Sequence, residues 1–337
     1  MSAPLEFAVA IPAHDALPDV LDAVESALAQ THPPAEIVVV DDRSGDGTGE
    51  QVRARFGDRV TVVSGHFGGA AAARNAAWRA SRAPWVAFLD ADDLWFPDKL
   101  ATVADRLAQS PDAIWFFSDG AFRTFEGETL PSWFELYAEI EEPYLGVPLA
   151  ELFEVNFVLT SSVVARRDAL EALGGFREDM SHAEDLDLWI RLALRGPAAG
   201  TGRPLVRYQH RPGGLTRQVE SRLLGNAGLF RRLAEDRALP AELRRLAERR
   251  SALAHYKLAI SALREGRTLD ARRHAAGSWL FPERVLPFTL VWSAARLPAS
   301  WVRRARGARW ATRSVVAPMG RHRRVTLRSA SAGGSGT

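Results

Sequence analysis

Three carboxylates, Asp90, Asp92 and Asp93, follow directly on the apolar run 85–89. An apolar run of this kind indicates a buried β-strand, so its end brings three negative charges to one point at the edge of a sheet. Like charges this close together destabilise a fold unless a cation neutralises them. A divalent metal with oxygen ligands meets that need and commonly bridges to phosphate groups. We favour metal or nucleotide binding for Asp90 and Asp92, whereas a solvated turn before a helix is an equal alternative for Asp93 and Asp98.

Alternating strand-like and helix-like segments are expected to position these carboxylates. Continuous apolar runs indicate buried strands at 7–11, 37–40, 60–64, 85–89 and 114–118. Helices are expected between them, at 17–30, at 70–80 and from about Pro97. This alternation predicts an α/β fold with a Rossmann-like, mostly parallel sheet flanked by helices on both faces. Ligands of such sheets sit beyond the carboxyl ends of the strands, where Asp42, Asp90 and Asp92 all lie.

The pattern changes in the second half of the chain. A strand is expected at 157–165, an amphipathic helix at 184–196 and a late strand at 205–208. From about residue 219 the chain has a helical pattern and is rich in Arg, and its last residues are of low complexity. The expected domains are an α/β domain at 1–218, a helical basic C-terminal region at 219–328 and a disordered tail at 329–337.

Composition narrows the class of protein. The chain of 337 residues is 47% apolar and 25% charged, which is typical of a soluble globular protein. Cysteine is absent, which excludes disulfides, thiolate metal ligands and a cysteine nucleophile. The N-terminus has no basic region before its apolar run, so we expect no signal peptide. These features fit a cytoplasmic protein.

Charge is distributed unevenly along the chain. Residues 1–230 hold 20 Lys/Arg and 34 Asp/Glu, whereas residues 231–337 hold 23 and 7. The acidic first part argues against nucleic acid as a partner, and no nucleic acid is expected. The basic second part could meet a phosphate-rich surface.

The basic region at 271–337 also carries aromatic residues. It holds 13 Arg and a single acid, interleaved with Trp279, Leu280, Phe281, Phe288, Trp292, Trp301 and Trp310. Its uncharged run, 285–295, is shorter than the roughly 20 residues of a membrane span. Two interpretations stay open. Either the region lies in an anionic membrane interface, which would make the protein peripheral at the inner face of the cell membrane, or it packs its aromatic residues on the first domain and exposes Arg.

Four segments resemble the family 2 glycosyltransferases with the GT-A fold. They are IPAHDALPDVLDAVESALAQTHPPAEIVVVDDRSGDGT at 11–48, GGAAAARNAA at 68–77, FLDADDLWFPDKL at 88–100 and GGFREDMSHAEDLDLWIRL at 174–192. Each motif alone is weak, but four in this order are highly specific, and the resemblance covers roughly residues 5–218. It implies an inverting enzyme that uses a nucleotide-sugar donor and Mn²⁺ or Mg²⁺.

The resemblance implies a nucleotide-binding loop after the first strand, made of Pro12, Ala13, His14 and Asp15. The family commonly has a hydroxyl residue and an aromatic residue where this chain has Ala13 and His14; His14 can still stack on a base. Asp42 corresponds to the carboxylate that accepts a hydrogen bond from the uracil N–H. Such an acceptor favours a UDP sugar over a CDP sugar. Turn formation is the alternative role of Asp42.

The resemblance also implies the residues that hold the diphosphate and the metal. Arg74 follows two glycines and corresponds to a diphosphate or donor contact, its alternative being a surface arginine on an Ala-rich helix. Asp90-Ala91-Asp92 matches the family's DXD motif. Asp92 corresponds to the direct metal ligand, and Asp90 to a contact to the ribose or, through water, to the metal.

The family's general base falls on the pair Glu184-Asp185, and the match favours Asp185. A sugar hydroxyl loses its proton as it attacks, and a carboxylate within hydrogen-bond reach can accept that proton. Asp185 lies in the first helical turn, where the helix dipole stabilises its ionised form. Glu184 has an equal alternative, since Ser181 and Glu184 have the spacing of a capping box.

Weaker resemblances concern five further residues. Ser161 and Ser162 match a segment beside the acceptor or the metal-diphosphate, and Trp189 follows the acidic pair where processive synthases have a different motif. His210 or Arg211 matches a residue near the diphosphate. The five expected acceptor or diphosphate contacts are thus Ser161, Ser162, Trp189, His210 and Arg211.

The sequence and the resemblance therefore predict a metal-dependent inverting glycosyltransferase with a UDP sugar as donor and a lipid-linked or polymeric glycan as acceptor. A catalytically degenerate GT-A protein that serves as a nucleotide-sugar-binding or membrane scaffold is the alternative, supported by Ala13. A sugar nucleotidyltransferase is less favoured, because the loop after the first strand lacks that class's Gly-rich, Arg-containing sequence. The same absence argues against a dinucleotide-binding dehydrogenase.

Overall fold

The computed structural model describes residues 4–123, 131–209, 219–278 and 324–329. The chain forms two compact units. Unit 1 comprises residues 1–180, 184–212 and 323–337, and unit 2 comprises residues 181–183 and 213–322. The predicted tail beyond residue 329 and the aromatic positions of 279–323 lie outside the described residues.

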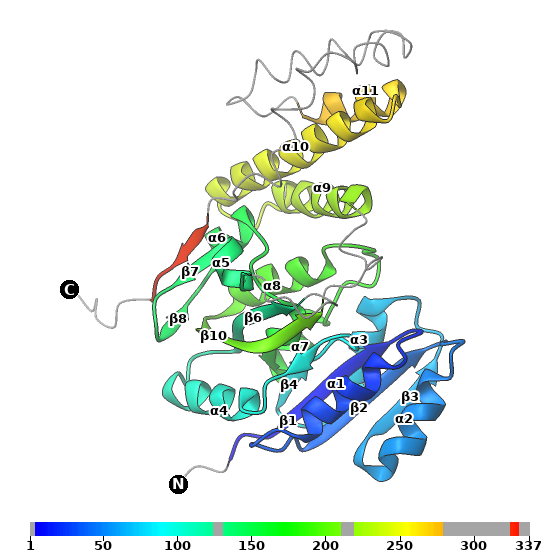
Figure 1. Ribbon diagram of the computed structural model, residues 1–337. Helices are drawn as coiled ribbons and strands as arrows, with labels where there is room; N and C mark the ends of the chain where they lie inside the picture. The colour runs from blue at the N-terminus through cyan, green and yellow to red at the C-terminus, as the bar shows by residue number, and fades with distance from the viewer. Residues whose placement is uncertain (1–3, 124–130, 210–218, 279–323, 330–337) are drawn as a thin grey trace, which may run out of the picture. The chain divides into compact units, whose positions relative to one another are not determined.

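Unit 1 is built on one sheet (Figure 1). In the described part of the chain, the sheet has nine strands in the order β3-β2-β1-β4-β9-β6-β10-β5, with β8 paired to β10. The strands are β1 (Phe7–Ala13), β2 (Glu36–Asp42), β3 (Thr61–Gly65), β4 (Trp85–Phe88), β5 (Leu94–Trp95), β6 (Trp115–Arg123), β8 (Tyr144–Gly146), β9 (Val164–Arg166) and β10 (Ala198–Gln209). The sequence's α/β prediction with a mostly parallel sheet is confirmed.

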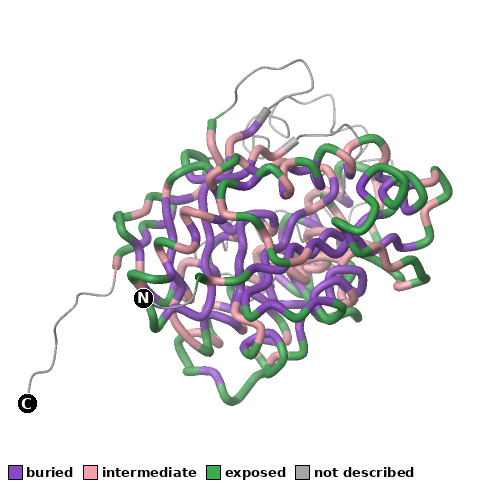
Figure 2. The backbone as a smooth tube through the Cα atoms, turned by 90° about the horizontal axis from the view of Figure 1, so that it is seen from below, coloured by how far each residue is buried: buried purple, intermediate pink, exposed green. Residues whose placement is uncertain are grey.

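Pairing in this sheet is parallel from β3 through β2 and β1 to β4, and again between β6 and β10. Strand β9 runs antiparallel between β4 and β6, and β5 and β8 run antiparallel to β10. Every residue of β1 and of β4 is buried, as expected for parallel strands covered on both faces (Figure 2). The carboxyl ends of β1, β2 and β4 consequently meet at one edge of the sheet.

Helices cover this sheet. They are α1 (Asp19–Leu28), α2 (Thr48–Phe56), α3 (Ala70–Ala80), α4 (Lys99–Gln109), α5 (Trp133–Tyr137), α6 (Leu149–Glu154), α7 (Arg167–Leu173) and α8 (Glu184–Arg195), with 3₁₀ turns η1 (Gly57–Arg59) and η2 (Thr160–Ser162). Of these, α1, α3, α4 and α8 lie where the sequence predicted helices. The strand predicted at 157–165 is mostly wrong, since only its last residues enter β9 and η2 occupies its centre. Hydroxyl side chains there bond to neighbouring groups instead of extending the strand.

A short segment near the end of the chain also belongs to unit 1. Strand β11 (Val325–Leu327) pairs in parallel with β7 (Ala138–Ile140) and forms a separate small sheet. The side chain of Leu327 is fully buried, and the backbone N–H of Glu141 donates to its carbonyl at 2.9 Å. The chain therefore returns to unit 1 after passing through unit 2.

Unit 2 is helical in its described part, as the sequence predicted. It contains α9 (Val219–Glu235), α10 (Ala241–Arg264) and α11 (Thr268–Gly277). Helix α10 packs against both of the others, and the hydroxyl of Ser251 donates to the carbonyl of Ala227 at 3.0 Å. Across the described residues, none of the helices has the length and apolar character needed to cross a bilayer.

Candidate active site

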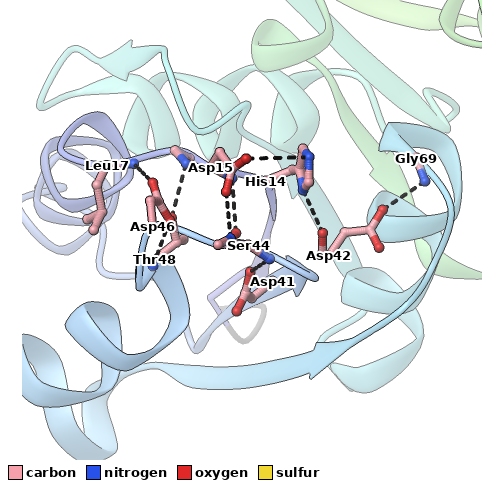
Figure 3. Close-up of polar contacts among 11 residues, drawn as sticks. His14, Asp15, Leu17, Asp41, Asp42, Ser44, Asp46, Thr48 and Gly69 are labelled. Atoms are coloured by element: carbon pink, nitrogen blue, oxygen red, sulfur yellow. Dashed lines mark hydrogen bonds and ion pairs between the residues drawn. The ribbon is translucent and has the colours of Figure 1, made fainter.

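The loops that follow β1 and β2 are held together by side-chain hydrogen bonds (Figure 3). The backbone N–H of Asp15 donates to the Ser44 hydroxyl at 3.0 Å, and the N–H of Gly45 donates back to the Asp15 carboxylate at 2.7 Å. Nδ1 of His14 lies 2.7 Å from the carbonyl oxygen of Asp42. A carbonyl can only accept, so Nδ1 carries a proton and donates it in this contact.

This loop leaves only part of the predicted nucleotide site accessible. The side chains of Pro12 and Ala13 are buried in β1, whereas His14 and Asp15 are exposed. More than half of the surface of the His14 side chain, 58%, is open to solvent. A nucleotide base could therefore stack on the exposed His14 ring, whereas the buried side chains of Pro12 and Ala13 cannot contact it in this way.

Asp42 has a role that the sequence analysis missed. Its Oδ1 accepts the backbone N–H of Phe67 at 2.7 Å, its Oδ2 accepts that of Gly69 at 2.8 Å, and Gly68 donates to it as well. Gly68 and Gly69 have φ values of 91° and 134°, which suit glycine. Burial alone would raise the pKa of Asp42, but these amide hydrogen bonds outweigh it and hold the pKa below its ordinary value.

The carboxylate of Asp42 thus accepts the amide groups of the loop 67–69 that leads into α3, and its negative charge lies near the N-terminus of that helix. The neighbouring Asp41 bonds to the N–H of Ser44 at 3.1 Å, which is turn chemistry. Both acids therefore organise backbone around the loop ends, and Asp42 in addition fixes the helix that carries Arg74.

Arg74 of α3 joins the two acidic motifs. Its Nε and Nη2 donate to Oδ1 of Asp90 at 3.0 and 2.8 Å, and its Nη1 donates to Oε1 of Glu184 at 3.0 Å. The Arg74 side chain is only 8% exposed and packs over the Phe176 ring. Burial would lower its pKa, but the charges of Asp90 and Glu184 raise it, so the guanidinium stays charged. In this structure Arg74 binds carboxylates, where the sequence analysis expected a diphosphate contact.

The loop after β4 is held by a serine on η2. The Ser161 hydroxyl accepts the backbone N–H of Asp90 at 3.0 Å and donates to Oδ2 of Asp93 at 2.5 Å. The carbonyl of Ser161 accepts from the Trp95 indole at 2.9 Å. Asp93 is buried within this network, so it supports the turn, whereas Asp90 and Asp92 are partly accessible.

The surroundings of Asp92 disfavour the ionised form of its carboxylate. Burial and the nearby charge of Asp90 raise the pKa of Asp92 to about 6, and Arg74 offsets this only in part. Within the residues that the structure describes, no three His, Cys, Asp or Glu side chains are grouped so as to hold a metal ion. A metal at this site would therefore need ligands beyond the protein, such as phosphate oxygens or water.

Asp185 lies in the first turn of α8. Its Oδ2 accepts from Nδ2 of Asn156 at 3.0 Å, and its Oδ1 accepts the backbone N–H of Leu186 at 2.7 Å. Burial and the charge of Glu184 raise the pKa of Asp185 to about 6, against the opposing effects of Arg74 and Asn156. Helix α8 begins at Glu184, whose side chain pairs with Arg74, and the alternative capping box with Ser181 stays a prediction.

Three of the weaker predictions need correction. Trp189 is fully buried and stacks on Trp115, with ring centroids 6.3 Å apart, so it packs the core and does not reach an acceptor. Ser162 is also fully buried, and its hydroxyl donates to the Leu159 carbonyl at 2.8 Å. Ser161 is 1% exposed, and its hydroxyl bonds to Asp90 and Asp93 in the loop after β4. His210 and Arg211 lie outside the described residues.

Two polar residues, the partly buried Asn156 and the fully buried Lys99, were not found from the sequence. Asn156 bonds to Asp185, and Lys99 donates to the Ser162 carbonyl at 2.9 Å from a fully buried position. Asn156 lies outside the four segments that resemble the family, and Lys99 lies in the segment 88–100 without a role that the resemblance assigned to it. Their proximity to the site follows from the tertiary fold alone.

Comparisons with known proteins identify the family of this chain. Residues 8–174 match the family model described as Glycosyl transferase family 2. A stretch of 95 residues is 42% identical to the putative teichuronic acid biosynthesis glycosyltransferase TuaG of Bacillus subtilis (strain 168), covering 27% of this chain and 38% of that protein. A stretch of 94 residues is 34% identical to the UDP-Glc:alpha-D-GlcNAc-diphosphoundecaprenol beta-1,3-glucosyltransferase WfaP of Escherichia coli, covering 28% and 38%. The chain thus spans less than half the length of these relatives.

Solved structures share the fold at low sequence identity. The crystal structure of S. aureus TarS 1-349 in complex with UDP-GlcNAc matches with a TM-score of 0.66 and 16% identity, covering 90% of this chain and 92% of that chain. The mannosyltransferase PcManGT from Pyrobaculum calidifontis in complex with GDP-Man and Mn²⁺ matches with a TM-score of 0.55 and 21% identity, covering 91% and 81%. Both likenesses concern the fold.

Proposed function

This chain belongs, through residues 8–174, to glycosyltransferase family 2, and we propose that it transfers a sugar from a nucleotide-sugar donor to an acceptor hydroxyl with inversion at the anomeric carbon. The observation that carries the proposal is the Arg74 bridge between Asp90 and Glu184, with side-chain distances of 2.8 and 3.0 Å. It holds the acidic end of β4 beside the acidic start of α8. One site then contains both the residues for a metal-diphosphate and a candidate base.

Asp185 is the proposed general base. Its carboxylate is held at both oxygens, which fixes its orientation for accepting the proton of the attacking hydroxyl. A pKa near 6 leaves Asp185 largely ionised at neutral pH and more basic than an exposed aspartate. Glu184 raises the proton affinity of Asp185, and its own contact to Arg74 keeps it in place.

Asp92 is the proposed metal ligand. Asp90 is engaged by Arg74, so the partly accessible carboxylate of Asp92 is the better placed of the two to bind Mn²⁺ or Mg²⁺. The pKa of Asp92 is raised by burial and by the negative charge of Asp90, and a divalent cation would neutralise this excess negative charge. Such an ion takes its remaining ligands from the donor diphosphate and water. When bound, it acts as a Lewis acid on the charge that develops on the leaving diphosphate.

A UDP sugar is the proposed donor. His14 and Asp15 present accessible side chains for the base, and Asp42 lies beside them with its carboxylate close to the loop at 67–69. WfaP is described as a transferase that uses UDP-Glc, and TarS was solved with UDP-GlcNAc, which supports a UDP sugar. PcManGT, in contrast, was solved with GDP-Man. The uracil contact of Asp42 stays a prediction, since three amide groups already bond to that carboxylate.

A lipid-linked or polymeric glycan is the proposed acceptor. WfaP is named for an acceptor on diphosphoundecaprenol, a lipid carrier. An acceptor of that kind would fit a protein that is peripheral at the inner face of the membrane and uses its basic C-terminal region to meet anionic lipid.

The first experiment is calorimetric titration of UDP, GDP, CDP and dTDP, each with Mn²⁺ and with EDTA. Metal-dependent binding of UDP alone is expected. Asp92→Asn should weaken that binding at least tenfold in Mn²⁺, whereas Asp112→Asn, at an exposed turn, should not change it. Metal-independent binding, or an unchanged affinity in Asp92→Asn, contradicts the metal assignment. No binding of any nucleotide supports the scaffold interpretation.

A further inference from the structure

Asn156 lies in the short connection between α6 and η2. The residues around it, Val155, Phe157 and Val158, are buried at 8%, 0% and 1% exposure. Phe157 packs edge-on against Phe117, with ring centroids 5.5 Å apart. These anchors fix the backbone on both sides of Asn156, so its side chain has a defined direction.

Two hydrogen bonds determine which way the Asn156 amide faces. Its Oδ1 accepts the backbone N–H of Val158 at 3.3 Å, and its Nδ2 donates to Oδ2 of Asp185 at 3.0 Å. Exchanging the amide oxygen and nitrogen would place an oxygen against a carboxylate and an NH₂ against an N–H. Both contacts would then be repulsive, so the contacts themselves settle the orientation.

We propose that Asn156 is a positioning residue for the reaction, which holds the Asp185 carboxylate in place and keeps it ionised by donating a hydrogen bond to the charged form. The inference rests on the proposed function, in which Asp185 is the base. Asn156 touches Asp185 and is not required to touch a substrate.

The electrostatic surroundings of Asp185 explain why a neutral donor is needed there. Glu184, on the same helix, adds a like charge that raises the pKa of Asp185 together with burial. Arg74, on α3, lowers that pKa, but its guanidinium is bonded to Glu184 and Asp90 and not to Asp185. Asn156 and the N–H of Leu186 are the groups that donate directly to the two oxygens. A hydrogen bond to the ionised form favours that form.

The test reads the ionisation of Asp185 directly, so it requires neither the donor nor the acceptor. The full chain is labelled with ¹³C at the aspartate carboxyl carbons, and the Asp185 signal is identified by its loss in Asp185→Asn. The signal should titrate near pH 6 in the unmodified chain, and its midpoint should move upward by about one pH unit in Asn156→Leu. Asn156→Asp, which adds a charge at the same size, should move it upward further.

Gln51→Glu, at an exposed position of α2, makes the same amide-to-acid change and should leave the midpoint in place. Thermal unfolding of each variant checks that the fold is kept, and a variant that does not fold is replaced by Asn156→Ser, which shortens the donor. An unchanged midpoint in folded Asn156→Leu and Asn156→Asp overturns the inference. The proposed function is tested separately by sugar transfer in Asp185→Asn: survival of transfer there removes Asp185 as the base, whatever Asn156 does to its ionisation.

Discussion

Asp185→Asn is expected to make the protein more stable at neutral pH while it removes the proposed base. The pKa of Asp185 is raised from 3.8 to about 6, because burial and Glu184 disfavour its charge. A folded-state pKa above the unfolded value means that the folded chain binds the proton more tightly. Stability from this group is therefore present at low pH and is lost as the pH rises from about 4 to about 6.

The magnitude follows from the difference between the two pKa values. One pKa unit corresponds to about 1.4 kcal/mol, so the ionised carboxylate costs roughly 3 kcal/mol at pH 8 and roughly 1.6 kcal/mol at pH 5. An asparagine has a single acceptor oxygen for the two donors Asn156 and Leu186, which costs about 1 kcal/mol at every pH. The gain on substitution should therefore grow by about 1.4 kcal/mol between pH 5 and pH 8.

The assay is thermal and urea unfolding of both proteins at pH 5, 6, 7 and 8. Because the chain has two compact units, the transition of unit 1 is the one to follow. Asp112→Asn, at an exposed turn, is the matched control and should show no pH-dependent gain. If the stabilities of Asp185→Asn and the unmodified chain run parallel from pH 5 to pH 8, Asp185 has an ordinary pKa and the electrostatic account of the site is refuted.

Three further changes test other parts of the site. Arg74→Met should cost about 2–3 kcal/mol, because it leaves the partly buried carboxylates of Asp90 and Glu184 without their cation. Arg79→Met, at a half-exposed position of the same helix, should cost under about 1 kcal/mol, and equal melting temperatures for the two would contradict the bridge. Asp42→Asn should lower the free energy of unfolding by about 1–3 kcal/mol, since the amide nitrogen cannot accept from the N–H groups that lead into α3, and a variant as stable as the unmodified chain would argue against a stabilising role of these hydrogen bonds. Lys99→Met should stabilise the protein more at pH 6 than at pH 9. Burial lowers the pKa of Lys99 to about 7, so the free-energy cost of burying its charge is fully present below pH 7 and disappears toward pH 10.5. A larger gain in the unfolding midpoint at pH 9 than at pH 6 would contradict this prediction.

The sequence predicted the sheet well because its strands are continuous apolar runs that end abruptly at polar residues. Runs such as 37–40 and 85–89 can be buried on both faces only in a covered sheet, so pattern and fold agree. The run at 157–165 is apolar only at its two ends and bends into η2 at its centre, where Ser161 and Ser162 bond to groups outside any strand ladder. The pattern of apolar residues around 157–165 does not show which distant groups these hydroxyls contact.

The chemistry-bearing residues were also predicted, but their contacts were not. Arg74 and Glu184 are 110 positions apart in the chain, and Asp185 and Asn156 are 29 apart. No periodic pattern connects such pairs, because their approach depends on how α3, α8 and the loop before η2 pack on the sheet. Trp189 illustrates the same gap, since its place in a motif suggested a ligand contact and its full burial against Trp115 shows a packing role.

Charge balance offers a reason why this arrangement persists at a cost to stability. In the described structure, Asp90, Asp92, Glu184 and Asp185 all lie within electrostatic reach of the single guanidinium of Arg74. One cation compensates one of four acids, and two of the others respond with a pKa raised to about 6. Apolar side chains of similar volume would serve folding better. A site that must attract a divalent cation at Asp92 and accept a proton at Asp185 requires this surplus, so the instability of the unliganded charges is itself an argument for their function.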